Sequence, residues 1–374
     1  MIYLLCIALL VFMLFLVGVY QTRKQLPAGL FWEGREHPGC ACEFLRDLTW
    51  VDARGKRQSD QQIMDAVLAM IRGARELILI DMFLFNDFAG ADQGGMRPLA
   101  REVTTALLAR RTGIPGLRIV LITDPINTVY GSLDNPYLAE LRNAGITVVC
   151  TDLDRLRDSN FLYSPLWRVF VKPFGTGAGT LLPNPFGKGR VSIRSYLRLL
   201  NFKANHRKLI VSDTRDGYMA LVTSANPHDA SSAHGNVALR FSGPAVRDIL
   251  ACERCIPGMP QDLLTANFVP VLSDCANDGI TVQVLSEGGI KKMVLGELAT
   301  VGEGDRVDLV MFYLADRQVI RALIRARQRG AGLRVLLDPN RDAFGRAKNG
   351  IPNRQTAAAL RGAGVAVRWG NTHG

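Results

Sequence analysis

The chain has 374 residues, more than one domain usually contains, so two cores or one duplicated architecture is expected. Its composition, 48% hydrophobic and 21% charged residues, is that of a globular enzyme and excludes a largely disordered chain. The formal net charge of +11 predicts an anionic partner, either phospholipid headgroups or nucleic acid.

The N-terminal residues 1–20 contain no charged side chain and are dominated by Leu, Ile, Val, Phe and Met. An apolar run of this length predicts a transmembrane anchor. A cleaved signal peptide is the competing interpretation, but no Lys or Arg precedes the run and no small-x-small cleavage site follows it. Arg23 and Lys24 follow the span directly, so the positive-inside rule predicts a single-pass protein with the rest of the chain in the cytoplasm.

Residues 21–58 are expected to form a linker, followed by a first unit over residues 59–265. A helix should begin at a capping box made by Ser59 and Gln62, before a continuously apolar strand at 76–85. The elements expected next are a helix at 97–111, a strand at 117–123, a helix at 137–143 and a strand at 146–149. This alternation predicts an α/β fold with a mainly parallel sheet flanked by helices.

The same order of elements returns in a second unit, residues 266–374. The matching positions are Met82-Phe83 with Met311-Phe312, Asp124 with Asp338, and Ala144-Gly145 with Ala363-Gly364. Three matches in the same order favour duplication over the chance similarity of any two α/β units.

Within the first unit, residues 160–189 form a long stretch rich in aromatic residues, Gly and Pro, which interrupts the unit and is expected to be irregular. Its aromatic side chains, mixed with Arg168 and Lys172, suit a surface that meets a lipid interface, although an ordinary packed loop fits equally well. A basic run from Lys188 to Lys208 follows, and we expect it to gather phosphate groups.

Seven cysteines, an odd number, are scattered along the chain and do not look like a disulfide framework. Cys40 with Cys42, and Cys252 with Cys255, have spacings that occur in zinc sites. Neither pair has a second pair or histidines at ligand spacing, so chance spacing of buried thiols is favoured. We therefore expect no metal and no cofactor.

A motif with chemical character opens a predicted strand at Asn205-His206-Arg207-Lys208. Side chains alternate along a strand, so His206 and Lys208 point to the same face and place an imidazole beside an ammonium. A second strand at 218–223 is followed by Ser224-Ala225-Asn226. Lys208 and the amide of Asn226 would supply fixed donors to the charged oxygens of a phosphodiester. A His and a Lys that merely face solvent are the less favoured interpretation.

With these residues the chain resembles the phospholipase D superfamily, whose hallmark is HxKxxxxD followed by G-[ST]-x-N. The residues that match, and so form the predicted catalytic set, are His206, Lys208, Asp213, Ser224 and Asn226. The resemblance implies that one His attacks phosphorus, here His206, while a second His protonates the leaving alcohol. Asp213, five residues past Lys208, is expected to support the site structurally.

Two positions depart from the family pattern. Thr223 stands where the family usually has Gly, and Asn236 stands near where many members carry a Glu that could hold the imidazole. Arg207, Lys203 and Asn236 are predicted to bind substrate. His228 and His234 flank the motif and are expected to be surface-loop histidines.

The resemblance implies a phosphatidyltransferase or hydrolase acting on membrane phospholipid, similar to the cardiolipin synthases of bacterial inner membranes. An anionic phospholipid membrane is the expected partner. A nuclease of the same superfamily is the alternative, although the anchor and the lack of an aromatic and basic platform for bases make nucleic acid less expected. A catalytically incomplete relative that only binds lipid is a third possibility.

The sequence contains one His-x-Lys, whereas the implied mechanism needs two. His373 has no residue two places on and cannot begin such a motif. Either the chain stops short of its second motif, or two copies pair as a homodimer in which each supplies one His206. Truncation is the favoured expectation, because a dimeric enzyme with one motif per chain would not need the second unit.

Overall fold

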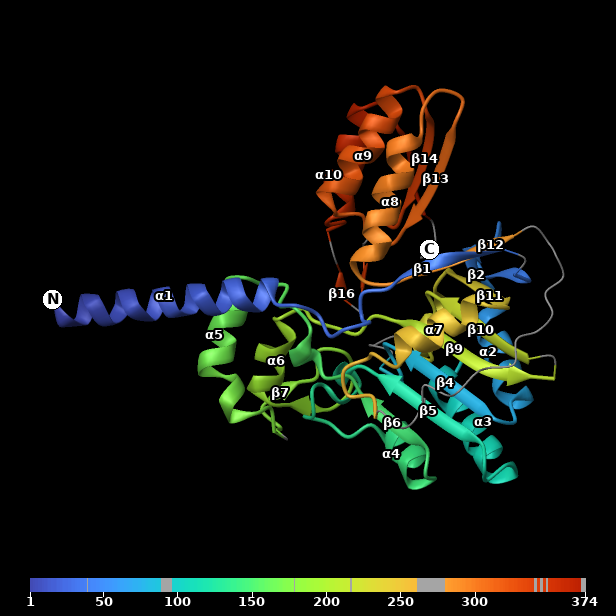
Figure 1. The fold of residues 1–374 in the computed structure, drawn as a ribbon, viewed down its shortest axis with the longest axis horizontal. Coiled ribbons are helices and arrows are strands. Elements are labelled where there is room, and N and C mark those ends of the chain that lie inside the picture. The colour runs from blue at the N-terminus through green and yellow to red at the C-terminus, as the bar shows by residue number, and fades with distance from the viewer. Residues whose placement is uncertain are drawn as a thin grey trace.

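The computed structural model describes the chain except for residues 39, 89–95, 178, 216, 261–279, 340–341, 344–345, 348 and 371–374. The boundary predicted at residue 265 and the C-terminal His373 lie outside the described residues. An apolar helix, α1 (Ile2–Arg23), extends away from the rest of the chain (Figure 1).

The elements of the first unit follow in chain order. They are β1 (Glu33–Pro38), β2 (Cys42–Val51), β3 (Arg57–Gln61), α2 (Ile63–Gly73), β4 (Leu77–Met82), α3 (Leu99–Gly113), β5 (Arg118–Thr123), α4 (Pro136–Asn143), β6 (Thr147–Cys150), α5 (Tyr163–Phe170), β7 (Leu182–Pro183), β8 (Arg190–Val191), α6 (Ile193–Leu199), β9 (Lys208–Thr214), β10 (Gly217–Thr223), β11 (Asn236–Ser242) and α7 (Ala245–Glu253). Short 3-10 turns cover Pro125–Thr128, Leu153–Arg155, Lys172–Phe174 and Asp229–Ala233.

The first unit is built on an eight-stranded sheet in the order β3-β2-β11-β10-β9-β4-β5-β6. Only the β4–β5 and β5–β6 pairs are parallel, and the other five pairs are antiparallel. The predicted α/β class is confirmed, but the mainly parallel sheet is wrong for this unit. The reason is that β9, β10 and β11 follow one another through short connections, without the helical crossover that a parallel pair requires.

Helices cover both faces of this sheet. The core on one face joins α2, α3 and α4 to the sheet, and the core on the other face contains α7. Every residue of β4 is buried, as its continuously apolar sequence predicts. The central strands are therefore held firmly from both sides.

The segment predicted as a linker, residues 21–58, instead supplies strands. β2 pairs with β11, β3 pairs with β2, and β1 pairs antiparallel with β12 (Thr281–Leu285). Exposed and buried residues alternate along the middle of β2, so it has no continuous apolar run, and such a strand is a weak signal in the sequence.

The predicted capping box at Ser59 is also wrong, because Ser59 lies in β3 and α2 begins at Ile63. The cap comes from a neighbouring strand. Oδ1 of the buried Asp47 accepts hydrogen bonds from the backbone N–H groups of Gln62, at 2.9 Å, and Ile63, at 3.1 Å. A long-range carboxylate thus replaces the local cap.

The second unit contains a smaller sheet with its own core. Its elements are β12, α8 (Gly288–Thr300), β13 (Arg306–Met311), α9 (Arg317–Gln328), β14 (Gly332–Leu337), β15 (Asp342–Ala343), β16 (Arg346–Ala347), α10 (Asn353–Gly362) and β17 (Ala366–Trp369). Strands β13, β14 and β17 are parallel, as predicted, and α8, α9 and α10 pack on them.

A repeated asparagine supports the duplication of the two units. Asn127 accepts a hydrogen bond from the N–H of Phe85 and donates to the carbonyls of Phe83 and Asp124. In the second unit, Asn353 accepts from Leu314 and donates to Phe312 and Asp338. The matching positions found in the sequence thus carry the same hydrogen bonds in the two units.

The capping role of Asp47 predicts a specific loss of stability. Asp47→Ala leaves two N–H groups at the start of α2 without their acceptor, and should lower the free energy of unfolding by about 1–2 kcal/mol. Asp47→Asn keeps an acceptor oxygen and should retain most of the stability. Thermal unfolding in detergent, followed by circular dichroism, measures this, with the exposed Asp60→Ala as control. Equal midpoints for the two alanine variants would rule the cap out.

Candidate active site

The motif residues meet at one edge of the first sheet. Strand β9 runs antiparallel to both of its neighbours, so its first residue lies beside the last residues of β4 and β10. Lys208 is paired with Met82, and Leu209 with Val222. The residues before β9 and after β10 are therefore brought together, although they are separated along the chain.

His206 and Lys208 are in direct contact at this edge. Lys208 Nζ lies 3.2 Å from His206 Nδ1 and 2.9 Å from the His206 carbonyl oxygen. Below them lies the ring of Phe83, whose centroid is 4.6 Å from that of the imidazole and 5.2 Å from Lys208 Nζ. Nothing in the chemistry of its side chain marks Phe83 as a site residue in the sequence. Its signal was its position immediately after the buried strand β4.

The environment sets the protonation of this pair. His206 is exposed, so its ring is accessible, whereas the Lys208 side chain is buried. Desolvation, followed by the charge of Lys208, lowers the pKa of His206 to about 4. Desolvation lowers the pKa of Lys208 to about 8, against the opposing effect of Asp81. At neutral pH a neutral imidazole therefore stands beside a charged ammonium, which suits a nucleophile next to an oxyanion-stabilising group.

Asn226 follows the end of β10, at the same edge of the sheet. It is buried, and its Oδ1 accepts a hydrogen bond from the N–H of Leu84, at 2.9 Å, two residues after the end of β4. This bond orients the amide at the strand end where Phe83 meets His206. The structure thus brings Asn226 to the same edge as His206 and Lys208.

Ser224 and Asn236 serve the connection between β10 and β11. Ser224 Oγ is 3.0 Å from Asn236 Oδ1 and accepts from the N–H of Val237 at 3.1 Å. The Asn236 amide donates to the carbonyls of Ser231 and His234, at 3.3 and 3.4 Å. Both polar ends of Asn236 are thus used by the protein, in place of the substrate-binding role predicted for it. Thr223, the other departure, accepts from the N–H of Ala225 and closes the same turn.

Asp213 lies at the opposite end of β9 from Lys208, about 17 Å away at a rise of about 3.3 Å per residue. Its carboxylate accepts from the backbone N–H groups of Arg75, Glu76 and Leu77, at 2.8, 2.9 and 2.9 Å. These bonds fix the entry to β4. These contacts of Asp213 are structural, and its place in the predicted catalytic set stays a prediction.

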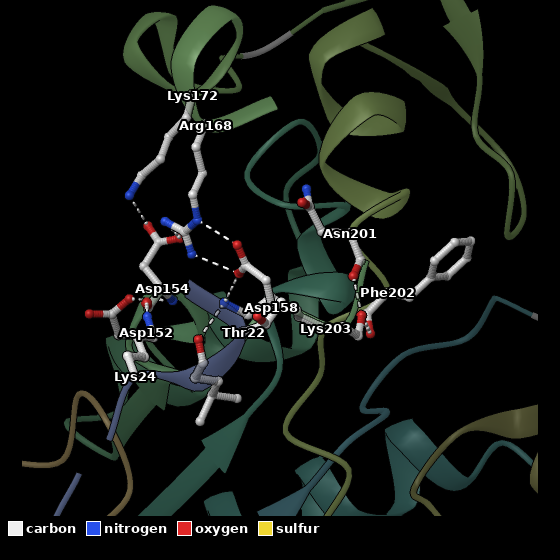
Figure 2. Close-up of polar contacts among 12 residues, drawn as sticks. Thr22, Lys24, Asp152, Asp154, Asp158, Arg168, Lys172, Asn201, Phe202 and Lys203 are labelled. Atoms are coloured by element: carbon white, nitrogen blue, oxygen red, sulfur yellow. Dashed lines mark hydrogen bonds and ion pairs between the residues drawn. The ribbon is translucent and has the colours of Figure 1, made fainter. Parts of the chain in front are cut away.

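Arg207 and Lys203, both predicted to bind substrate, each form an ion pair within the protein, and their binding of substrate stays a prediction. Alternation along the strand turns Arg207 to the face opposite Lys208, where Nη1 lies 2.8 Å from Oε1 of the buried Glu253 in α7. Lys203 Nζ lies 2.9 Å from Asp158 Oδ1 and donates to the carbonyl of Leu156 (Figure 2). A basic run in the sequence does not show which cations have a buried partner.

A buried polar network holds the residue before His206. The Asn205 amide donates to both carboxylate oxygens of Asp81, at 3.0 and 2.9 Å, and its backbone N–H donates to Asp124 at 2.8 Å. Burial, then the charge of Glu253, raises the pKa of Asp81 well above its usual range. Burial raises the pKa of Asp124 to about 6. Asp81 was not among the predicted site residues. The feature that marks it in the sequence is an acidic residue within an otherwise apolar strand.

His228 and Cys252 have partners other than His206 and Lys208. His228, predicted to be on the surface, is buried, with Nδ1 3.1 Å from the Asn86 carbonyl oxygen, because the two residues form an isolated β-bridge. Cys252 is buried against Arg207 and Ser286. Within the described part of the chain, no group of three or more His, Cys, Asp or Glu side chains could hold a metal ion.

The chain is similar to solved structures of several proteins. No curated protein matches the chain. Similar structures include polyphosphate kinase from Porphyromonas gingivalis, with 12% identity and a TM-score of 0.41 over 88% of this chain and 40% of that chain. Nuc, a phospholipase D family member from Salmonella typhimurium, has 14% identity and a TM-score of 0.30, over 57% of this chain and 91% of that chain. Phosphatidylserine synthase from Haemophilus influenzae has 10% identity and a TM-score of 0.48, over 95% of this chain and 77% of that chain. The chain therefore spans less than half the length of that kinase.

The family match falls on the second unit. Residues 297–374 match the model described as cardiolipin synthase, PLD-like domain. The first unit carries the His206, Lys208 and Asn226 site, and the two units share the asparagine hydrogen bonds of a duplicated fold. The second unit is therefore similar to a phospholipase D-like domain over residues 297–374.

Proposed function

We propose that this protein transfers or hydrolyses the phosphatidyl group of a membrane phospholipid through a phosphohistidine on His206. The observation that carries the proposal is the contact of an accessible, neutral imidazole with a buried ammonium, 3.2 Å apart. A cardiolipin synthase-like transfer between two lipids is the specific form that the family match of residues 297–374 favours.

The reaction proceeds in two displacements at phosphorus. An unprotonated ring nitrogen of His206 forms a bond to phosphorus while the bond to the leaving alcohol breaks. Lys208 and the Asn226 amide stabilise the charge on the non-bridging oxygens. Water or a second alcohol then attacks phosphorus, and the phosphorus–nitrogen bond breaks. The leaving alkoxide takes up a proton, which we propose comes from water, because His206 is unprotonated at neutral pH. The attacking water or alcohol releases a proton in the second displacement, so the two steps balance.

The substrate is proposed to be lipid because of α1. This helix has 22 residues with a mean hydropathy of 3.0 in its most apolar window, and is long and apolar enough to cross a membrane. Only 6% of that window is buried inside the protein, so the helix is not packed as a core helix of the folded domain. Arg23 and Lys24 at its end favour an inner-membrane orientation with the site in the cytoplasm, and the net charge of +11 suits anionic lipids.

The substrate class can be tested directly on the full chain in mixed micelles. Labelled phosphatidylglycerol or phosphatidylethanolamine should yield labelled phosphatidyl products, and labelled single-stranded DNA should remain intact. The readout is chromatography of the products after incubation, with His206→Asn as the inactive control. If DNA is cleaved while the phospholipids stay intact, this proposal is contradicted and the alternative function, a nuclease, is supported.

The first displacement can be tested without a second histidine. A soluble diester with a nitrophenolate leaving group needs no general acid, because nitrophenolate leaves unprotonated. We expect a burst of nitrophenolate close to one equivalent per chain, lost in His206→Ala and retained in the exposed His234→Ala. An undiminished burst in His206→Ala would exclude His206 as the nucleophile.

The pKa values predict the pH dependence of this burst. Below a pH of about 4 the imidazole of His206 is protonated and cannot attack. Above a pH of about 8 the Lys208 ammonium loses the charge that stabilises the transition state. The burst rate should therefore be flat from about pH 5 to 7 and fall above pH 8. Lys208→Arg should remove the alkaline fall, because arginine stays charged. A wild-type rate that is flat through pH 9.5 contradicts this role for Lys208.

A further inference from the structure

Helix α5 turns an uncharged apolar stripe to the outside. Leu162, Leu166 and Phe170 are spaced by four residues, so they lie on one side of the helix, and they are 80%, 44% and 50% exposed. The opposite side, with Pro165 and Trp167, is buried in the protein. A continuous exposed stripe of this kind, unlike single exposed apolar residues, indicates a surface that is covered in use.

This stripe continues from the apolar helix α1. The rings of Phe15 in α1 and Phe161 meet edge to face, with centroids 6.0 Å apart. A Cβ at Gly18 would lie 3.0 Å from the Phe161 ring and 3.1 Å from Pro165, so glycine allows the two segments to approach closely. Figure 1 shows α5 running across the C-terminal end of α1.

The geometry of α1 sets the level of α5 relative to a bilayer. The 22 residues of α1 span about 33 Å, close to the thickness of a hydrocarbon core. Phe15 and Gly18 lie in its last third, within about 12 Å of the helix end. α5 therefore lies at the boundary between acyl chains and headgroups, where in-plane amphipathic helices bind.

The charges of α5 face the protein and leave the stripe uncharged. Arg168 Nε lies 2.6 Å from Asp158 Oδ2, and its side chain is 10% exposed. Lys172, just after α5, lies 2.9 Å from Asp154 Oδ2. Figure 2 shows both cations directed at these carboxylates.

Asp158 joins this surface to the active site. Its backbone N–H donates to the carbonyl of Gln21 in α1, and its carboxylate binds both Arg168 of α5 and Lys203 (Figure 2). Lys203 precedes His206 by three residues. Burial alone would raise the pKa of Asp158, but the hydrogen bonds from Arg168 and Lys203 outweigh burial and lower the pKa, so the carboxylate is charged at neutral pH.

We propose that α5 is an in-plane membrane-binding helix, with Leu162, Leu166 and Phe170 inserted at the lipid interface and Asp158 holding the His206 site at a fixed height above it. The occupant of the stripe is a lipid bilayer, because the stripe is continuous with α1 and meets it at the level of a bilayer surface. The height of the site matters only if the proposed function holds, whereas lipid contact of α5 does not depend on it.

Lipid contact is tested on the full chain reconstituted in phosphatidylcholine and phosphatidylglycerol vesicles that carry acyl chains brominated near the headgroup. Leu166→Trp and Phe170→Trp each add an indole to the stripe. The control is Val237→Trp, at a 52% exposed position on β11, which lies far from α5 (Figure 1). We expect bromine to quench about half or more of the added fluorescence on α5 and little of that on β11. Equal quenching at the three positions overturns the proposal.

A second measurement separates this surface from the chemistry. Leu166→Asp with Phe170→Asp should lower turnover of vesicle phospholipid about tenfold or more, and change the nitrophenolate burst on the soluble diester less than about twofold. Equal losses on both substrates would contradict an interfacial role for α5. If the wild type shows no burst at all, the proposed function fails, while the quenching result still decides whether α5 contacts lipid.

Discussion

The antiparallel placement of β9 between β4 and β10 is the constraint on which the site depends. This pairing puts the start of one strand beside the ends of two others, so His206, Lys208, Phe83 and Asn226 gather from distant parts of the sequence. Asp213 fixes the far end of β9 through three backbone N–H groups. A strand held at both ends can keep a nucleophile in one orientation with little loss of conformational entropy during the reaction.

The basic residues near the motif differ in whether a carboxylate partner neutralises their charge. Of the basic residues near the motif, Arg207 and Lys203 are satisfied by Glu253 and Asp158, and Lys208 keeps its ammonium beside the imidazole. Removing one partner of a buried ion pair leaves an uncompensated charge and destabilises the fold, so Glu253 and Asp158 stabilise the structure. Lys208, in contrast, is poised near the pH at which it titrates, as expected for a group that meets an anionic substrate.

Much of the fold and the chemical pair could be predicted from the sequence. Helical and strand periodicities predicted most elements between residues 63 and 150 and between 288 and 369, and strand alternation predicted that His206 and Lys208 share a face. What failed depended on long-range partners. The cap of α2 comes from Asp47 on another strand, Arg207 is fixed by Glu253, and the strands of residues 33–61 exist because β11 and β12 pair with them. No local pattern encodes such partners.

The central claim is that His206 forms a covalent bond to phosphorus of a phospholipid. The most direct test is to react the full chain with a phospholipid, quench it under alkaline conditions that preserve phosphohistidine, and map the modified peptide by mass spectrometry. The account predicts one phosphatidyl adduct, on the peptide that contains His206 and on its imidazole. An adduct on another residue, or turnover of the lipid with no protein-bound phosphorus at any time, would contradict it.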